Sequence, residues 1–269
     1  MIDNVILFGS TGMLGRYILS YFSKRLNVYA PSIRIRDGIS VYDIETELKK
    51  GGINENTCVI NCIGSIPQRN RDPRIFYIVN GVFPHVLSTL CSKYGAKMIQ
   101  PSTDCVFNGT HGGYIETDLH DESIDYGMSK SIGEPAECMV IRTSIIGEEL
   151  HNKRSFLEFV RTSRGDISCW ENHMWNGITC LEYCKLIETI FSTNSFWTGV
   201  RHVFSPRSVS KYEMACMIRD AYNLDIRIRN VSTTQSCNKT LNSVYPAVFT
   251  VSDLKLQIEE LRAYNLNTI

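Results

Sequence analysis

The sequence predicts an α/β protein, a doubly wound parallel sheet with a smaller C-terminal lobe. Apolar strand-like runs alternate with helix-length segments through the first half, and the first of these runs leads straight into a glycine turn. After about residue 144 the alternation loosens. Strands that alternate with helices imply βαβ units with right-handed crossovers. We therefore expect one domain over residues 1–145 and a substrate-binding lobe, partly interleaved with the sheet, over 146–269.

Each predicted element rests on its apolar period. Short apolar runs rich in Val and Ile indicate buried strands, and in chain order they lie at 5–8, 26–30, 57–63, 97–101, 138–142 and 225–231. Apolar residues three or four positions apart indicate helices. Helices are predicted at 13–24, 44–50, 80–94, 123–136, 156–162, 181–191, 211–221 and 253–263.

Composition excludes several classes of function. Lys and Arg number 28 and so do Asp and Glu, so the chain lacks a global basic field for nucleic acid or an anionic membrane. No apolar run approaches the length of about 20 residues that a membrane span needs. Residues 1–9 indicate a first strand rather than a signal peptide. Because the ten cysteines include no Cys-x-x-Cys pair, we expect cytoplasmic buried thiols and no metal site.

The glycine turn indicates a dinucleotide site of the Rossmann type. It reads Gly9-Ser10-Thr11-Gly12-Met13-Leu14-Gly15, directly after a strand and at the start of a helix. Glycine lets backbone N–H groups approach a pyrophosphate, and the helix N-terminus adds donors and partial positive charge. The alternative is a plain turn before a packed helix.

The segment after the second strand favours NADPH over NADH as cofactor. An acidic residue there would accept the ribose hydroxyl of NAD, whereas this chain has Arg34 and Arg36, which suit a 2′-phosphate. In the alternative interpretation, both arginines are solvated and Asp37 binds the ribose. Asp43 and Ile44 are expected near the adenine.

The end of the third strand supplies the other expected cofactor contacts. Cys62-Ile63-Gly64 lies at the carboxyl edge of the sheet, where doubly wound folds bind ligands. A glycine at that point lets the cofactor approach closely, although Gly64 would also suit a strand-ending turn.

Tyr126 and Lys130 suggest the chemistry. At i and i+4 they share one face of a helix, so the ammonium is expected to lower the pKa of the phenol. Such a phenol can exchange a proton with a carbonyl or hydroxyl. The hydroxyl of Thr103 would hold the same substrate oxygen, so the three residues predict hydride transfer to or from a carbonyl.

These motifs together resemble a known family. Gly9-x-x-Gly12-x-x-Gly15, the Ser102–Gly109 segment, Tyr126-Gly127-x-Ser129-Lys130 and the Arg142-Thr143-Ser144 strand end occur in the order seen in extended short-chain dehydrogenases. The resemblance is strongest to the dTDP-4-dehydrorhamnose reductase branch and spans essentially the whole chain, more loosely in the second half.

The resemblance implies a role for each matched residue. Thr103 would be the catalytic hydroxyl, Tyr126 the proton donor and Lys130 the residue that binds the nicotinamide ribose. The implied reaction reduces the C4 ketone of a nucleotide-linked 4-keto-6-deoxyhexose. Thr103, Asp104 and Cys105 would contact the sugar.

Two departures from the family pattern leave alternatives open. Cys105 replaces the usual aromatic of the Ser-Thr-Asp segment, as in bifunctional epimerase–reductases, where a cysteine acts in epimerisation at C3 or at C3 and C5. Trp175 and Asn176 lie in a polar and aromatic segment that suits substrate binding, although packing explains Trp175 equally well.

A third reading of the chain is a non-catalytic dinucleotide-binding subunit, like the regulatory subunit of methionine adenosyltransferase. The sequence leaves open the nucleotide, the C2 substituent and the product stereochemistry. A homodimer would be unsurprising.

Overall fold

A six-stranded parallel sheet forms the centre of the molecule. The computed structural model describes residues 2–35, 38, 40–150, 153–264 and 266. The strand order is β10-β5-β4-β3-β1-β2, with bounds β1 Asn4–Phe8, β2 Asn27–Tyr29, β3 Thr57–Asn61, β4 Lys97–Ser102, β5 Met139–Arg142 and β10 Gly199–His202. The predicted doubly wound parallel sheet is therefore confirmed. Its chain order reverses between β1 and β3, and sheets of this kind bind ligands beyond the strand ends at such a point.

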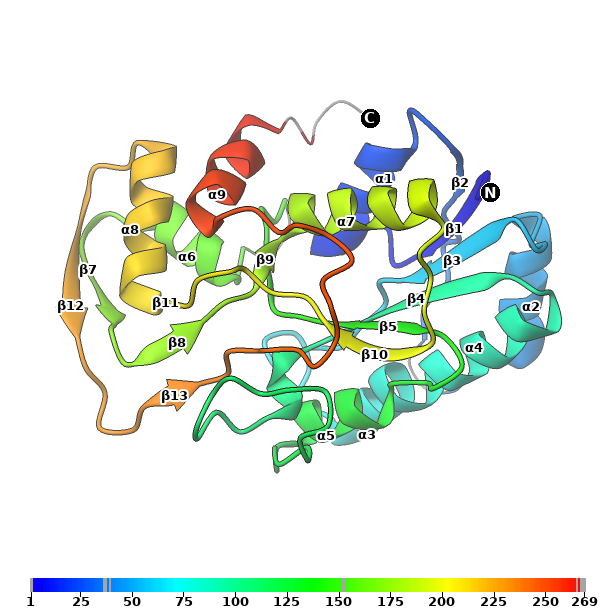
Figure 1. Ribbon diagram of the computed structural model, residues 1–269, viewed down its shortest axis with the longest axis horizontal. Coiled ribbons are helices and arrows are strands. Elements are labelled where there is room, and N and C mark those ends of the chain that lie inside the picture. The colour runs from blue at the N-terminus through cyan, green and yellow to red at the C-terminus, as the bar shows by residue number, and fades with distance from the viewer. Residues whose placement is uncertain (1, 36–37, 39, 151–152, 265, 267–269) are drawn as a thin grey trace.

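Helices cover both faces of this sheet (Figure 1). One face carries α1 (Met13–Phe22) and α7 (Cys180–Thr193), and the other carries α2 (Val41–Lys50), α4 (Phe83–Lys93) and α5 (Asp125–Ile132). Each face has its own buried apolar cluster, and the strand side chains alternate between the two clusters along β1. Parallel strands buried on both faces give the continuous apolar runs in the sequence.

A long apolar helical stretch lies on the second face. It joins α3 (Pro73–Phe76), the π-helical η1 (Tyr77–Val82) and α4, so it spans Pro73–Lys93 with a mean hydropathy of 1.4. Length and composition alone would allow this stretch to cross a bilayer. The sequence pattern does not predict this feature, because the helix expected there begins only at residue 80. Because 56% of its most apolar window is buried inside the protein, we interpret it as a core helix.

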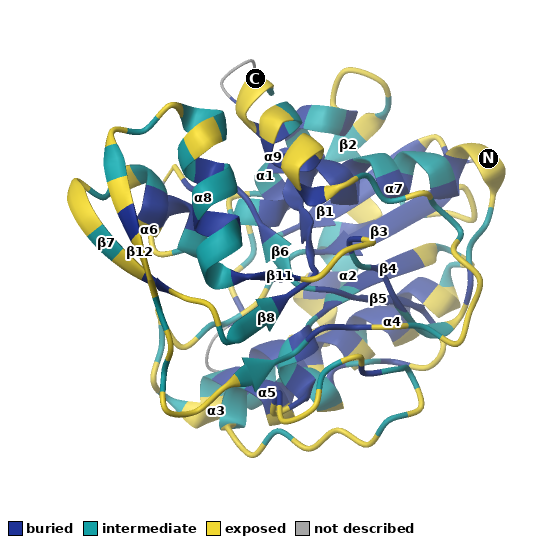
Figure 2. Ribbon diagram, turned by 60° about the vertical axis from the view of Figure 1, so that its left-hand side comes forward, coloured by how far each residue is buried: buried dark blue, intermediate teal, exposed yellow. Residues whose placement is uncertain are grey.

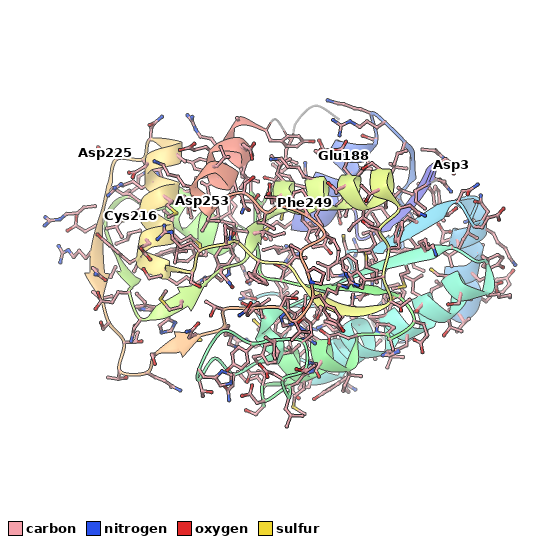
Figure 3. The ribbon with its side chains drawn as sticks, in the orientation of Figure 1. Asp3, Glu188, Cys216, Asp225, Phe249 and Asp253 are labelled. Atoms are coloured by element: carbon pink, nitrogen blue, oxygen red, sulfur yellow. The ribbon has the colours of Figure 1, made fainter. Side chains whose placement is uncertain are left out.

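The second half of the chain contributes to the sheet as well as to the lobe. Strand β10 pairs with β5, and Glu188 of α7 accepts a 2.5 Å hydrogen bond from Tyr21 of α1 (Figure 3). The helix α9 (Leu254–Ala263) packs against α7 and α8 (Lys211–Tyr222). The boundary at 145/146 stays a prediction.

The lobe gathers at one end of the sheet (Figure 1). Besides α8 it contains α6 (Phe156–Thr162) and the parallel pair β7 (Gly165–Trp170) and β12 (Ile226–Val231). These two strands are largely exposed, in contrast to the buried central sheet (Figure 2). The remaining short strands are β6 (Ile145–Ile146), β8 (His173–Trp175), β9 (Ile178–Thr179), β11 (Val209–Ser210) and β13 (Cys237–Asn238).

Candidate active site

A cavity of about 580 Å³ opens where β1, β3, β4 and β5 end. Its lining runs from Gly12 of the glycine turn to Thr103, Tyr126 and Lys130. A second cavity of about 630 Å³ shares Gly12 and Cys62–Gly64 with the first and continues to Arg34. The glycine turn and the Thr–Tyr–Lys group thus border one connected space beyond the carboxyl ends of the strands.

The glycine turn is built by close backbone contacts. Gly9 has φ +79°, and a Cβ there would lie 2.6 Å from the Cys62 carbonyl carbon. A Cβ on Gly15 would lie 2.2 Å from the Gly9 oxygen, so this glycine lets α1 pack against the turn. The nearest atom to a Cβ on Gly12 is 3.4 Å away, so Gly12 instead leaves room at the cavity.

The start of α1 fits a pyrophosphate. Its N-cap is Gly12, which offers no side-chain acceptor, so N–H groups of the first turn are left for a ligand. Gly9, Thr11 and Gly12 line the outer cavity, and Gly12, Met13 and Leu14 line the inner one. Ser10 lines neither cavity, so its expected contact with the cofactor stays a prediction. The residues present therefore fit a dinucleotide.

Only some of the residues expected at the adenine end of the cofactor line the cavities. Arg34 lines the outer cavity, and Arg36 lies outside the described residues. Ile44 has no exposed surface, because its side chain packs in the apolar core, and Asp43 lies exposed in the first turn of α2. Neither residue lines either cavity, and the expectation that Asp43 and Ile44 lie near the adenine stays a prediction. Cys62, Ile63 and Gly64 line both cavities.

Thr103, Tyr126 and Lys130 converge on the inner cavity. Thr103 follows β4 and caps the 3-10 turn η2 (Asp104–Val106); its hydroxyl donates to Asp104 Oδ1 at 3.0 Å and accepts from the Cys105 N–H at 3.1 Å. The Thr103 side chain lies near enough to the Tyr126 phenol to act on its pKa, which it lowers. Lys130 Nζ donates to the Pro101 carbonyl at 2.9 Å, one strand position before Ser102.

Burial sets the protonation of this group. Burial, followed by the acidic neighbours Cys105 and Asp104, raises the pKa of Tyr126 well above its ordinary value. Burial also lowers the pKa of Lys130 to about 8, against the pull of Glu134. The expected lowering of the Tyr126 pKa by Lys130 is therefore wrong for this state: the ammonium binds a backbone carbonyl, and the phenol keeps its proton at neutral pH.

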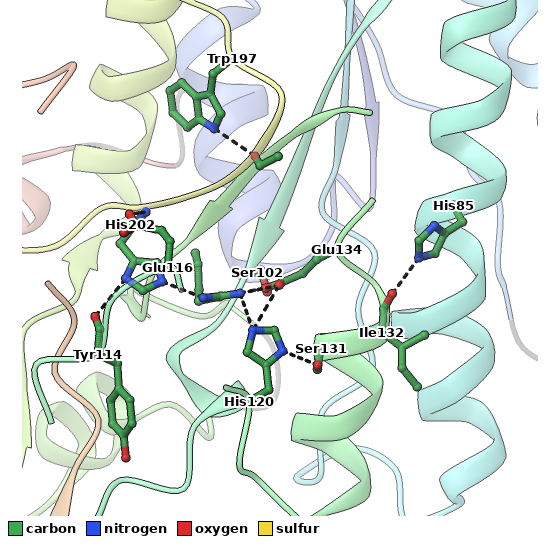
Figure 4. A network of polar contacts seen from close by, with 12 residues as sticks. His85, Ser102, Tyr114, Glu116, His120, Ser131, Ile132, Glu134, Trp197 and His202 are labelled. Atoms are coloured by element: carbon green, nitrogen blue, oxygen red, sulfur yellow. Dashed lines mark hydrogen bonds and ion pairs between the residues drawn. The ribbon is translucent and has the colours of Figure 1, made fainter. Parts of the chain in front are cut away.

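A buried ionic network holds the end of β4 against α5 (Figure 4). Ser102 Oγ donates to Glu134 at 2.5 Å, and Glu134 pairs with Arg142 at 2.5 Å. Arg142 is 1% exposed and donates to His202 Nε2 at 2.8 Å and to His120 Nε2 at 2.7 Å. Because a guanidinium only donates, both histidines must accept at Nε2 and are therefore neutral.

The Cys105 thiol lines the same cavity. Its Sγ donates to Asp104 Oδ1 at 3.5 Å, and burial together with the Asp104 charge raises its pKa to about 12. The thiol is thus held protonated. Asp104 is buried, and its Oδ1 accepts hydrogen bonds from the Thr103 hydroxyl and the Cys105 thiol. It therefore orders the turn beside the cavity.

Trp175 and Asn176 do not reach the cavity. Trp175 is 4% exposed within the core, with the Lys211 ammonium 5.4 Å from its ring centroid. Asn176 is buried, and its side-chain amide pairs with Leu241: Nδ2 donates to the carbonyl at 2.8 Å and Oδ1 accepts from the N–H at 2.9 Å. The prediction that both bind substrate is therefore wrong, because their polar and aromatic groups are used in packing the lobe.

Sequence reasoning missed the charged residues that form the rest of the cavity wall. They are Arg69, Glu122, Glu149, Arg154 and Lys239. Arg69 pairs with Glu149 at 3.3 Å, and Arg154 Nη1 donates to the Gln68 carbonyl, so the loop after β3 is joined to the segment before α6. These residues lie in irregular segments, where spacing gives no signal of convergence.

The parallel sheet, the glycine turn and the Thr–Tyr–Lys group define a Rossmann-type protein of the extended short-chain dehydrogenase class. The family model described as "RmlD substrate binding domain" matches residues 3–262, and the chain belongs to that family.

Several known proteins are similar to this chain in fold or in sequence. A dTDP-4-dehydrorhamnose reductase from Bacillus anthracis, solved with NADP, covers 98% of this chain and 99% of its own with a TM-score of 0.82 at 19% identity, which shows the shared fold. The spore coat polysaccharide biosynthesis protein SpsK of Bacillus subtilis is 28% identical over 67% of this chain and 66% of its own length.

Two further relatives differ from each other in role. The dTDP-4-dehydrorhamnose reductase of Streptomyces griseus is 29% identical over 51% of this chain, and methionine adenosyltransferase 2 subunit beta of Danio rerio is 27% identical over 52%. These matches span 45% and 48% of those two relatives.

Proposed function

We propose that this protein reduces the C4 ketone of a nucleotide-linked 4-keto-6-deoxyhexose with NADPH. The observation that carries the proposal is the convergence of Thr103, Tyr126 and Lys130 on one cavity continuous with the glycine turn. The family and the reductases among its relatives support the same substrate class.

The residues of the cavity suit the reductive direction. NADPH would supply the hydride when bound along Gly9–Leu14, with Arg34 at the 2′-phosphate end and Cys62–Gly64 and Lys130 nearer the nicotinamide. Tyr126 keeps its proton, so its hydroxyl can donate to the ketone oxygen as charge develops there. Thr103, which lines the same cavity, would hold the same oxygen in place.

The test is turnover of purified protein with NADPH and a panel of enzymatically made dTDP-, UDP- and GDP-4-keto-6-deoxysugars, including a 2-acetamido member. We expect NADPH oxidation with at least one of them and a 4-hydroxy product by NMR. Absence of turnover with every member, while NADPH binds, would contradict the proposal. NADH in parallel tests the cofactor preference that Arg34 supports.

The structure favours simple reduction over the epimerase alternative. An epimerising base at Cys105 would need a thiolate, but the thiol donates to Asp104 and its pKa is raised to about 12. Solvent deuterium appearing at C3 or C5 of the product, above the nonenzymatic background, would restore the bifunctional reading.

The regulatory-subunit alternative draws on the methionine adenosyltransferase relatives. A purely structural role does not require Thr103, Tyr126 and Lys130 to meet at one cavity, so their convergence favours catalysis. If Tyr126→Phe left cofactor binding and substrate turnover unchanged, that result would favour the regulatory role.

All ten thiols are free, which supports a cytoplasmic location.

A further inference from the structure

Lys239 and Glu122 form an ion pair on the wall of the catalytic cavity. Lys239 Nζ donates to Glu122 Oε2 at 2.9 Å, and the two side chains are 19% and 11% exposed. Both line the cavity that holds Thr103 and Tyr126. Lys239 follows β13, and Glu122 precedes α5, so the pair connects the lobe to the catalytic helix.

The fold makes room for both side chains. A Cβ on Gly109 would lie 2.9 Å from Lys239 Cγ, and a Cβ on Gly127 would lie 2.3 Å from Glu122 Cγ. Gly127 is the glycine next to Tyr126, so the Glu122 side chain crosses the catalytic helix beside the proton donor. The aliphatic stems of Lys239 and Glu122 thus each occupy the space left by a glycine that has no Cβ.

Backbone pairing fixes the Lys239 segment. Asn238 N donates to the Gly109 carbonyl at 2.7 Å, and Tyr114 N donates to the Thr240 carbonyl at 2.9 Å. The segment on either side of Lys239 is therefore attached to the loop that follows Thr103. The carboxylate is fixed as well, because its Oε1 accepts from the N–H groups of Ser123 and Ile124 at 2.9 and 3.2 Å.

Both groups are charged at neutral pH. Burial lowers the pKa of Lys239, but the acidic groups of Cys105, Glu122 and Asp104 outweigh burial and leave it raised. Burial raises the pKa of Glu122, but the Lys239 ammonium and two backbone N–H groups outweigh that effect. Within the described part of the chain, Glu122 is the one hydrogen-bond partner of Lys239 Nζ, so the other two N–H donors of this cavity-lining ammonium are left for a ligand.

We propose that Lys239 and Glu122 are specificity-determining residues that read the C3 hydroxyl of the sugar. This inference rests on the proposed function. A hydroxyl both donates and accepts, so it can accept from the ammonium and donate to the carboxylate. Both residues line the inner cavity with Thr103 and Tyr126, neither lines the outer cavity at the glycine turn, and Glu122 packs against Gly127 beside Tyr126, so the pair lies on the side of the reacting carbonyl.

Sugar chemistry selects the hydroxyl. In a 4-keto-6-deoxyhexose the two carbons beside C4 are C5, which carries the ring oxygen and a methyl group, and C3, which carries a hydroxyl. A donor–acceptor pair beside the ketone therefore finds its complement at C3.

The experiment uses NADP⁺-loaded protein and calorimetric titration with dTDP and with dTDP-rhamnose, the reduced form of a candidate substrate. Lys239→Met keeps the stem in the space left by Gly109 and removes the charge, and Glu122→Gln keeps the size. We expect each to weaken dTDP-rhamnose about tenfold or more, the scale of a hydrogen bond to a charged group, and to leave dTDP within about twofold. Arg229→Met, which breaks the exposed pair with Asp166 on β7, is the matched control and should change neither affinity.

A 3-deoxy analogue of the sugar ligand tests the contact with the C3 hydroxyl directly. Wild type should bind it about tenfold more weakly than the parent sugar, and in Lys239→Met, which keeps only the Glu122 acceptor, this difference should fall to about threefold or less. Equal loss of dTDP and sugar-nucleotide affinity, or discrimination unchanged in the variant, would overturn the assignment. Because these are binding measurements, they can fail while turnover by wild type succeeds; conversely, absence of turnover by wild type would count against the proposed function alone.

Discussion

The two walls of the catalytic cavity are built in different ways. One wall consists of strand ends and the helix α5, which position Thr103, Tyr126 and Lys130. The other wall consists of irregular segments from both halves of the chain, which carry Arg69, Glu122, Glu149, Arg154 and Lys239. Residues on regular elements can be located by spacing, whereas those on irregular segments depend on pairing between distant parts of the chain.

The largest expected effect tests the regular wall. Tyr126→Phe keeps the ring that packs edge-on against Phe76 at 6.1 Å but removes the proton donor. We expect kcat to fall about a hundredfold to ten-thousandfold with NADPH affinity unchanged, measured by steady-state kinetics and fluorescence titration. Tyr77→Phe, which loses a 3.0 Å hydrogen bond to Asp125 outside the cavity, is the control and should retain turnover. Equal turnover by the Tyr126 variant and wild type would contradict the catalytic assignment.

Substitutions at two glycines of the turn are expected to affect the stability of the protein and its binding of NADPH separately. Gly15→Ala places a Cβ 2.2 Å from the Gly9 oxygen, so we expect the free energy of unfolding to fall by about 3 kcal/mol or more. Gly12→Ala has 3.4 Å of space, so it should fold normally yet bind NADPH weakly, because its methyl enters the cofactor cavity. Urea unfolding and NADPH titration of both variants check this; similar losses of stability in the two would show that the contacts at Gly15 relax.

The limits of prediction follow from the same contrast. The i, i+4 spacing placed Tyr126 and Lys130 on one helix face, and the alternation of strands and helices predicted five of the six central strands, while β10 was missed within a loosely patterned half. Asn176 resembled a binding residue because polar side chains near aromatics serve either purpose. Its pairing with Leu241, 65 residues away, could not be inferred from local sequence.

Asn176 gives the next smaller effect and tests the packing of the irregular second half. Asn176→Ala leaves a buried carbonyl and a buried N–H of Leu241 without partners, so we expect the free energy of unfolding to fall by about 2 kcal/mol. The apparent KM for the sugar nucleotide should stay near that of wild type, because the side chain lies outside the cavity. Kinetics and urea unfolding of the same preparation decide the matter, and a raised KM at unchanged stability would return Asn176 to the substrate site.

The smallest effect concerns the network that joins the two halves, because Arg142 of β5 binds His120 from the first half and His202 from β10. Burial, followed by the Arg142 charge, lowers the pKa of both histidines, against Glu134 and Asp121 at His120 and Glu116 at His202. A histidine whose pKa is lowered in the folded state protonates first in the unfolded chain. It therefore contributes stability that is complete above its ordinary pKa of about 6.5 and is lost as pH falls toward the folded value.

His120→Gln keeps an acceptor for Arg142 but cannot titrate. We expect wild type to lose more stability than this variant between about pH 7.5 and pH 5, a range that spans the ordinary histidine pKa. Urea unfolding of both proteins across this range measures the difference, and the shared carboxylate titrations cancel in the comparison. A gap between the two proteins that stays constant with pH would mean that His120 has the same pKa in the folded and the unfolded protein. Burial beside the Arg142 guanidinium would then have no net effect on the protonation of His120.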